Sequence, residues 1–105
     1  MKLKESIEGA NLFNEYHCEL TDELDKISGL DDKDSVLHHY VVVDDHSKKT
    51  RCLPIRIPGG TVGGVWFNEN LTIIKIIIDT NYVVKTYPDD VNEVVQKYVG
   101  KVLEL

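Results

Sequence analysis

Five stretches rich in β-branched and aromatic residues follow one another between residues 38 and 87, and they constrain the fold more than any other feature. Short polar or glycine-rich connections separate them, which is typical of strands joined by hairpins. Consecutive strands with short connections are usually neighbours in a sheet. The pattern therefore predicts an antiparallel meander of four to five strands. The stretches are 39–45, 51–57, 61–67, 71–79 and 82–87.

Two of these stretches contain residues that indicate their position in the sheet. The run 71–79 is almost continuously apolar, which predicts a central strand covered on both faces, with Lys75 marking an approach to the surface. Pro54 has no amide hydrogen to give to a neighbouring strand. We therefore expect the stretch 51–57 to lie at an edge of the sheet or to carry a bulge.

The C-terminal residues repeat apolar side chains with the period of an α-helix. Asp89 and Asp90 precede the repeat, where acidic side chains favour the start of a helix. We predict a helix over about 90–103 that packs on one face of the sheet, which gives an α+β fold. The apolar positions are Val91, Val94, Val95, Tyr98, Val99, Val102 and Leu103.

The first 36 residues predict a short helical N-terminal arm that packs beside the sheet or caps one of its edges. Residues 3–13 have one apolar helical face, which favours a short helix. Thr21 is a candidate cap and Gly29 a candidate stop for a second helix. Between them, residues 15–20 alternate with period two, so that segment is either a strand or a bend.

The composition indicates one globular domain over 1–105. Apolar residues make up 42% of the chain, but no run reaches the roughly 18 needed for a membrane helix. The start of the chain lacks the apolar core of a secretory signal, so we expect a cytoplasmic protein. Cys18 and Cys52 do not form a CxxC motif, and small buried thiols in a reducing compartment are the simplest interpretation. A disulfide or a reactive thiol stays open.

Charge is distributed unevenly along the chain. Residues 1–45 contain 12 acidic and 4 basic residues, whereas residues 46–105 contain 6 acidic and 8 basic residues. A net charge of −6 repels phosphate backbones and disfavours direct nucleic-acid binding. An acidic surface of this kind suits a basic macromolecular partner instead.

The stretch HHYVVVDDH, residues 38–46, contains three histidines and two aspartates. On one straight strand, His38 and His46 would lie roughly 26 Å apart, too far to share a metal ion. A zinc site needs three or four converging ligands. The stretch therefore predicts a strand with polar ends rather than a metal site, and no metal or cofactor is expected.

A small nuclease is the alternative enzyme hypothesis. His46, Lys48 and Arg51 lie close together in the sequence, where a histidine base and basic side chains could act on a phosphate. The net acidity of the chain speaks against this function, and a solvated hairpin tip explains the same residues.

Two further motifs favour structure over chemistry. The glycine pairs 59–60 and 63–64 lack the lysine and the following helix of a phosphate loop, so we expect a turn and a bulge or close contact. Asp32 and Asp34 match the start of a calcium loop, but the glycine it requires is replaced by Leu37.

Trp66 is the single tryptophan of the chain, and it is either a core residue or a binding anchor.

The leading functional hypothesis is a small non-enzymatic binding protein with an acidic N-terminal surface for a basic protein partner. Inhibitors, immunity proteins and phage or mobile-element regulatory proteins have this profile, an analogy of class rather than of family. A structural or self-assembling domain, including a sheet-edge homodimer, is a further alternative. The candidate partner-binding residues are Glu15, Glu19, Asp22, Glu23, Asp25, Asp31, Asp32 and Asp34.

Overall fold

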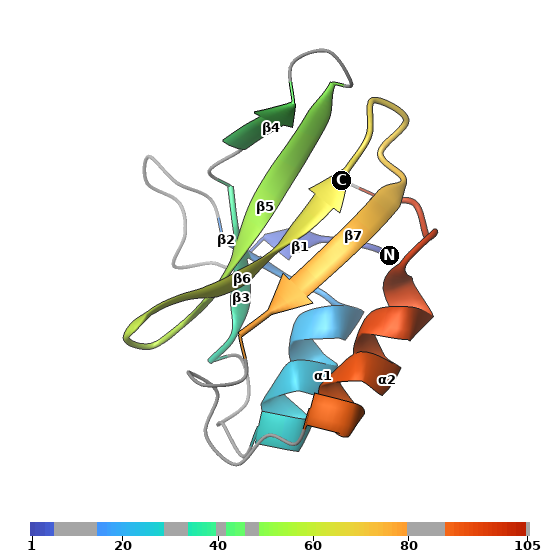
Figure 1. The fold of residues 1–105 in the computed structure, drawn as a ribbon. Helices are drawn as coiled ribbons and strands as arrows, with labels where there is room; N and C mark the ends of the chain where they lie inside the picture. Colours follow the sequence, from blue (N-terminus) through green and yellow to red (C-terminus); the bar gives the residue numbers. More distant parts are fainter. Residues whose placement is uncertain (6–14, 29–33, 40–41, 46–48, 80–87, 105) are drawn as a thin grey trace.

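Seven strands form one antiparallel sheet in the part of the chain that the structure describes (Figure 1). The computed structural model describes residues 1–5, 15–28, 34–39, 42–45, 49–79 and 88–104. Two helices lie side by side against the sheet, so the α+β fold with a packed C-terminal helix is confirmed. The elements are β1 (Lys4–Glu5), β2 (Glu15–His17), α1 (Glu19–Ser28), β3 (Val36–His38), β4 (Val42–Asp45), β5 (Thr50–Ile57), β6 (Gly60–Phe67), β7 (Ile73–Ile78) and α2 (Pro88–Tyr98).

The meander predicted from short connections is present in β4, β5, β6 and β7. Each of these strands pairs antiparallel with the next along the chain. The turn between β6 and β7 is held by Asn68, whose side-chain oxygen accepts hydrogen bonds from the backbone N–H groups of Asn70 and Thr72. The strand predicted over 82–87 lies outside the described residues.

β5 lies inside the sheet, and Pro54 is accommodated where the neighbouring strand changes. On that side, β4 is registered with residues up to Cys52 and β3 with residues from Ile55 onward. Pro54 falls between these two described strands, so its missing N–H does not interrupt a ladder. An edge position for this strand is therefore wrong, whereas the alternative, a bulge, is found directly after Pro54 at Ile55/Arg56.

The predicted helical N-terminal arm is present in α1, but strands that were not predicted precede this helix. β1 is a strand where a helix over 3–13 was expected, and residues 6–14 lie outside the described part. In the ambiguous segment 15–20, residues 15–17 form β2, which pairs with both β1 and β3, whereas residues 19–20 already belong to α1. Strands of two and three residues are too short to show a reliable alternation in sequence.

α1 begins at Glu19, two residues before the predicted cap Thr21. The Thr21 hydroxyl accepts a hydrogen bond from the Cys18 N–H at 2.9 Å and donates one to the Cys18 carbonyl at 3.0 Å. Thr21 therefore stabilises the first turn from within the helix, in the manner of the second partner of a capping box.

α2 ends at Tyr98, five residues before the predicted end. Gly100 has a φ of 93°, in the left-handed region that commonly terminates helices. Its N–H donates to the Ile73 carbonyl at 2.7 Å, which ties the end of the helix to β7. Val102 and Leu103 fit a helical repeat in sequence, but they belong to an extended segment.

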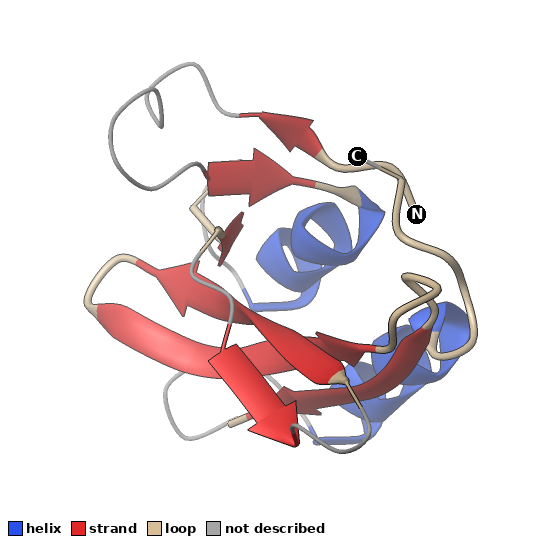
Figure 2. Cartoon of the chain, turned by 90° about the horizontal axis from the view of Figure 1, so that it is seen from above, coloured by secondary structure: helices blue, strands red, loops and turns tan. Residues whose placement is uncertain are grey.

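That segment, residues 101–104, is called the closing tail. On one side, the N–H of Ile73 donates to the Lys101 carbonyl, and the N–H of Leu103 donates to the Leu71 carbonyl, each at 2.8 Å. On the other side, the N–H of Leu3 donates to the Glu104 carbonyl at 2.8 Å. The tail thus joins the β7 end of the sheet to the β1 end, and the sheet closes on itself with both chain ends near each other (Figure 2).

The core fills the space between the closed sheet and the two helices. Both helices contribute one apolar stripe to it, and the strands contribute alternate side chains. In the described residues, no helix has the length and apolar character to span a membrane. The most deeply enclosed core side chains are Leu20, Leu37, Ile55, Val65 and Ile73.

β7 is covered on one face only, contrary to the prediction for 71–79. Ile73 and Ile76 are buried, whereas Ile74 and Ile77 are 45% and 48% exposed. Lys75 is exposed, as its place in the apolar run indicated. A continuous apolar run therefore does not identify a central strand here.

Candidate functional site

α1 presents most of its charged residues away from the core. Leu20 and Leu24 are buried in the core, and the neighbouring small or polar residues of that stripe are buried with them. The opposite side carries Glu19 and Asp22, which are exposed. Two of the eight predicted partner-binding residues therefore lie on an open helical surface.

Asp25 is the exception on this helix, since it is 3% exposed. Its Oδ1 atom accepts hydrogen bonds from the Ser35 N–H at 3.0 Å and from the Ser35 hydroxyl at 2.6 Å. The same hydroxyl lies 2.8 Å from the Thr21 carbonyl. The Asp25 carboxylate thus fixes the chain just before β3 to α1, and it is not part of the open surface.

Glu23 lies at the flank of α1 and joins the two helices. Its Oε1 accepts a hydrogen bond from Lys97 Nζ at 2.5 Å, and its Oε2 accepts one from the Tyr98 hydroxyl. Burial alone would raise the pKa of Glu23, but the two hydrogen bonds outweigh it and lower that pKa below its ordinary value. Burial and the contact with Glu23 both raise the pKa of Tyr98, so the phenol is a stable donor.

α2 packs against α1 and carries further exposed carboxylates. The two helices run antiparallel (Figure 1), and Glu23 in the middle of α1 meets Lys97 near the end of α2. Only Lys26 and Lys97 oppose the carboxylates of this helical pair. We call the following group the acidic helical surface: Glu19, Asp22, Glu23, Asp89, Asp90 and Glu93.

Three members of this surface were not among the predicted binding residues. The sequence predicts a capping role for Asp89 and Asp90, and it gave no reason to single out Glu93. All three are exposed. The polar face of the C-terminal repeat contained a signal for them, but only the packing of α1 against α2 shows that both helices belong to one layer, with the start of α2 beside the end of α1 (Figure 1).

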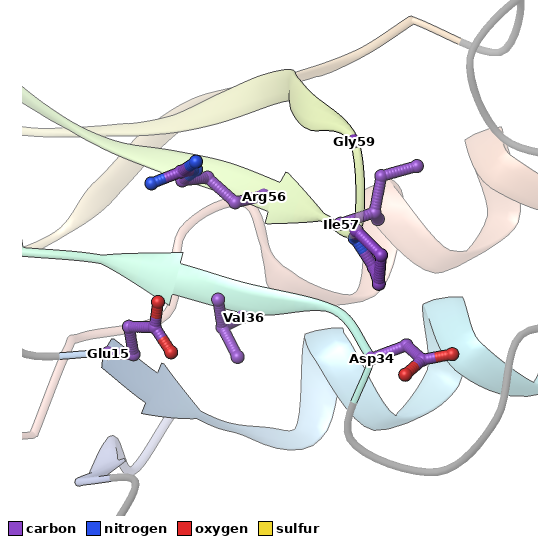
Figure 3. Close-up of a pocket in the computed structure, with 7 residues that line it drawn as sticks. Glu15, Asp34, Val36, Arg56, Ile57 and Gly59 are labelled. Carbon is purple, nitrogen blue, oxygen red and sulfur yellow. The ribbon is translucent and has the colours of Figure 1, made fainter. Parts of the chain in front are cut away.

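Glu15 and Asp34 belong to a different part of the molecule. They line a pocket of about 330 Å³ on the sheet, together with Arg56 and residues of the β5–β6 turn (Figure 3). In Figure 3, Glu15 and Asp34 lie toward opposite ends of this pocket. The remaining predicted residues, Asp31 and Asp32, lie outside the described part of the chain.

The stretch 38–46 does not form the single strand expected from its sequence. β3 ends at His38 and β4 begins at Val42, and the two strands pair with different parts of β5. His39 is exposed, and its Nδ1 lies 2.8 Å from the Tyr16 hydroxyl. Within the residues that can be described, no group of three potential ligands could hold a metal ion.

Of the three nuclease residues, Arg51 is the one that lies in the described part of the chain. Arg51 is exposed on β5 and lines a pocket with Lys49 and Phe67. Lys49 is engaged with Glu69 at 3.3 Å, as expected of a solvated turn. His46 and Lys48 lie outside the described residues, so the nuclease hypothesis stays a prediction.

Trp66 lies on the outer face of the sheet rather than in the central core. Its register partners are Cys52 on β5 and Lys75 on β7. The Lys75 ammonium lies 4.5 Å from the centre of the indole ring, a cation–π contact. The indole is half-buried, so it is neither a core residue nor a fully open binding anchor.

Comparison with known proteins finds no match among family models, curated proteins or solved structures.

Proposed function

We propose that this chain is a small non-enzymatic binding protein that presents the acidic helical surface to a basic protein partner. The observation that supports this most directly is the antiparallel pairing of α1 and α2, which gathers carboxylates from both helices on one pair of elements. An inhibitor, an immunity protein or a phage or mobile-element regulatory protein would act in this way. The buried free thiols of Cys18 and Cys52 fit a reducing compartment such as the cytoplasm.

Electrostatics favour a basic protein as the partner. Carboxylates repel the phosphate backbone of a nucleic acid, whereas they attract lysine- and arginine-rich surfaces over a distance set by the ionic strength. Such complementarity acts mainly on the association rate and on the choice of partner. The fold contributes rigidity, because Glu23 ties the two helices together through Lys97 and Tyr98.

The test is affinity capture from a lysate of the source cells, followed by native mass spectrometry of the eluted complex. Tagged wild-type protein is compared with Glu19→Lys/Asp22→Lys, which reverses two exposed charges on α1. The matched control is Glu69→Lys/Glu104→Lys, which makes the same change in net charge at exposed positions elsewhere.

We expect a stoichiometric complex with a basic protein that weakens as salt is raised. With the partner purified, the α1 reversal should lower the association rate constant about tenfold at low ionic strength, while the control changes it much less. Equal effects of both double variants would attribute binding to net charge and contradict a defined surface. A partner that binds both variants as tightly as wild type would remove the proposal.

A further inference from the structure

β7 ends the sheet on the side away from β6, and the closing tail covers only part of that edge. The tail pairs with Leu71 and Ile73, so it reaches no farther along β7 than Ile73. In the described part of the chain, no other strand pairs with the edge from Ile74 to Ile78. Ile74 and Ile77 are also the most exposed isoleucines of the molecule's described surface. Open edges of this kind tend to pair with another strand.

The direction of the backbone groups along this edge follows from the contact with β6. The Asp79 N–H donates to the Val62 carbonyl at 2.7 Å, so the polar groups of Asp79 point toward β6. In an antiparallel ladder, successive residues direct their N–H and C=O groups to opposite sides. The backbone groups of Ile76 and Ile78 therefore point toward the edge and can accept a further strand.

We propose that β7 pairs antiparallel with β7 of a second copy of the chain, with Ile77 opposite the partner's Ile77. This places Ile76 opposite the partner's Ile78, so that edge-directed backbone groups meet edge-directed groups. The arrangement is a two-fold symmetric, self-complementary interface, the commonest form of homodimer. It is independent of the acidic helical surface, which lies on α1 and α2.

The neighbouring symmetric registers fit less well. Centring the pair on Ile76 would place Asp79 opposite the partner's Ile73, an edge position that the closing tail already occupies. Centring it on Ile78 would place the apolar Ile77 opposite the partner's Asp79. Of these three registers, only the one centred on Ile77 both uses the edge beyond the tail and places isoleucine opposite isoleucine.

Charge complementarity supports the same register. Lys75 and Asp79 are both exposed, and each is two residues from Ile77, so all three point to the outer face of β7. Pairing centred on Ile77 places Lys75 opposite the partner's Asp79, and symmetry repeats the contact on the other side of the axis. Opposite charges directly across a ladder stabilise it, and like charges destabilise it.

The test is a charge swap between two variants, followed by analytical ultracentrifugation over a dilution series. The wild-type dimer should have a dissociation constant of roughly 100 µM, since an interface this small binds weakly. Lys75→Asp alone and Asp79→Lys alone each place like charges across the axis, and each should raise the dimer dissociation constant about tenfold.

An equimolar mixture of the two variants should form a heterodimer. One copy then presents carboxylates at both positions 75 and 79, and the other copy presents ammonium groups at both, so opposite charges face each other again. A folding defect from loss of the Trp66 contact would not be repaired by mixing.

Matched controls are Lys49→Asp and Glu69→Lys, an exposed ion pair away from β7. These variants should dimerise like wild type, singly and mixed. A wild-type chain that stays monomeric at about 1 mM, ten times the expected dissociation constant, would overturn the proposal. So would a dimer that survives in both β7 variants, or a mixture of them that shows no association beyond that of its components.

Discussion

Asp22 and Asp25 lie three residues apart on α1 and have different environments. Asp22 is exposed, whereas Asp25 is buried and accepts two hydrogen bonds from Ser35. A buried carboxylate is tolerated only where such partners compensate for its lost hydration. The same residue type thus contributes to solubility at position 22, whereas at position 25 it holds Ser35, directly before β3, against α1.

Removing the Asp25 carboxylate should be costly, because the Ser35 N–H would then remain buried without its acceptor. We expect Asp25→Ala to lower the free energy of unfolding by about 3 kcal/mol, measured by urea denaturation. Asp22→Ala, the control on the same helix, should change it by less than about 0.5 kcal/mol. Equal effects of the two substitutions would show that the Ser35 contacts do not stabilise the fold.

Glu23 should make stability depend on pH. Its pKa is lowered in the folded protein, so its contribution is present above the ordinary value of 4.5 and is lost as the pH falls through the lowered pKa. Glu23→Gln should therefore cost about 1 kcal/mol near neutral pH and almost nothing in acid. Urea denaturation between about pH 3 and pH 7 measures this difference. Glu93→Gln is the control, and a cost for Glu23→Gln that does not vary with pH would contradict the ion pair.

At the scale of the element, β6 depends on two adjacent glycines that allow close approach on either side. A Cβ atom at Gly63 would lie 2.0 Å from the Ile77 carbonyl oxygen, which belongs to the backbone of β7. A Cβ atom at Gly64 would lie 2.5 Å from Cys52 Sγ and 3.1 Å from the Trp66 ring. Gly64 thus leaves room for the indole against the sheet, and Gly63 leaves room for the next strand.

The two glycines should respond differently to alanine. Gly63→Ala should destabilise the protein by about 3 kcal/mol or more, because the β7 backbone must move. Gly64→Ala should cost about 1–2 kcal/mol, because side chains can yield more easily, and it should shift the Trp66 fluorescence. Thermal denaturation followed by tryptophan emission checks both values. The reverse order of the two effects would contradict this account of the contacts.

Sequence patterns predicted elements where local chemistry decides the structure. The hairpins of β4 to β7 follow from β-branched runs and polar turns, and the start of α2 follows from Asp89 and Asp90. The end of α2 was not predictable from periodicity, because Leu103 fits the helical repeat while its actual partner, Leu71, is distant in sequence. The pairing of β1 with β2 was missed for the same reason.

The candidate site was predictable only in part. The excess of acids in the first half of the chain pointed to Glu19 and Asp22, which are indeed exposed. No pattern could separate Asp25 from them, because its hydrogen-bond partner Ser35 lies 10 residues farther along the sequence. The contribution of α2 required knowledge of how the two helices pack, which is a tertiary property.

At the scale of the whole molecule, the closing tail connects the start of β7 to the first residues of the chain. Leu103 points into the core and is 3% exposed, whereas its neighbour Val102 is 49% exposed. The Val102 carbonyl accepts a hydrogen bond from the N-terminal amine of Met1 at 2.5 Å. The tail is therefore held both by its own apolar side chain and by the first residues of the chain.

Leu103→Ala should lower the free energy of unfolding by about 3 kcal/mol, because it leaves a cavity between the ends of the sheet. Val102→Ala is the matched control, and it should cost less than about 1 kcal/mol because half of its side chain already faces solvent. Chemical denaturation measures both. Equal costs would show that the tail lies on the surface without stabilising the closed sheet.

The closing tail also links aggregation to a very small motion. Detachment of residues 101–104 would expose the backbone of the first residues before β1 and of the start of β7 at the same time, because the tail is hydrogen-bonded to both. Exposed strand margins are templates for pairing with other chains. Amide hydrogen exchange at Ile73, Leu103 and Glu104 would measure how often the tail detaches, because the N–H groups of these residues donate hydrogen bonds that hold it. The aggregation rate of concentrated protein would then depend on how often this short segment detaches, rather than on the free energy of unfolding of the whole domain.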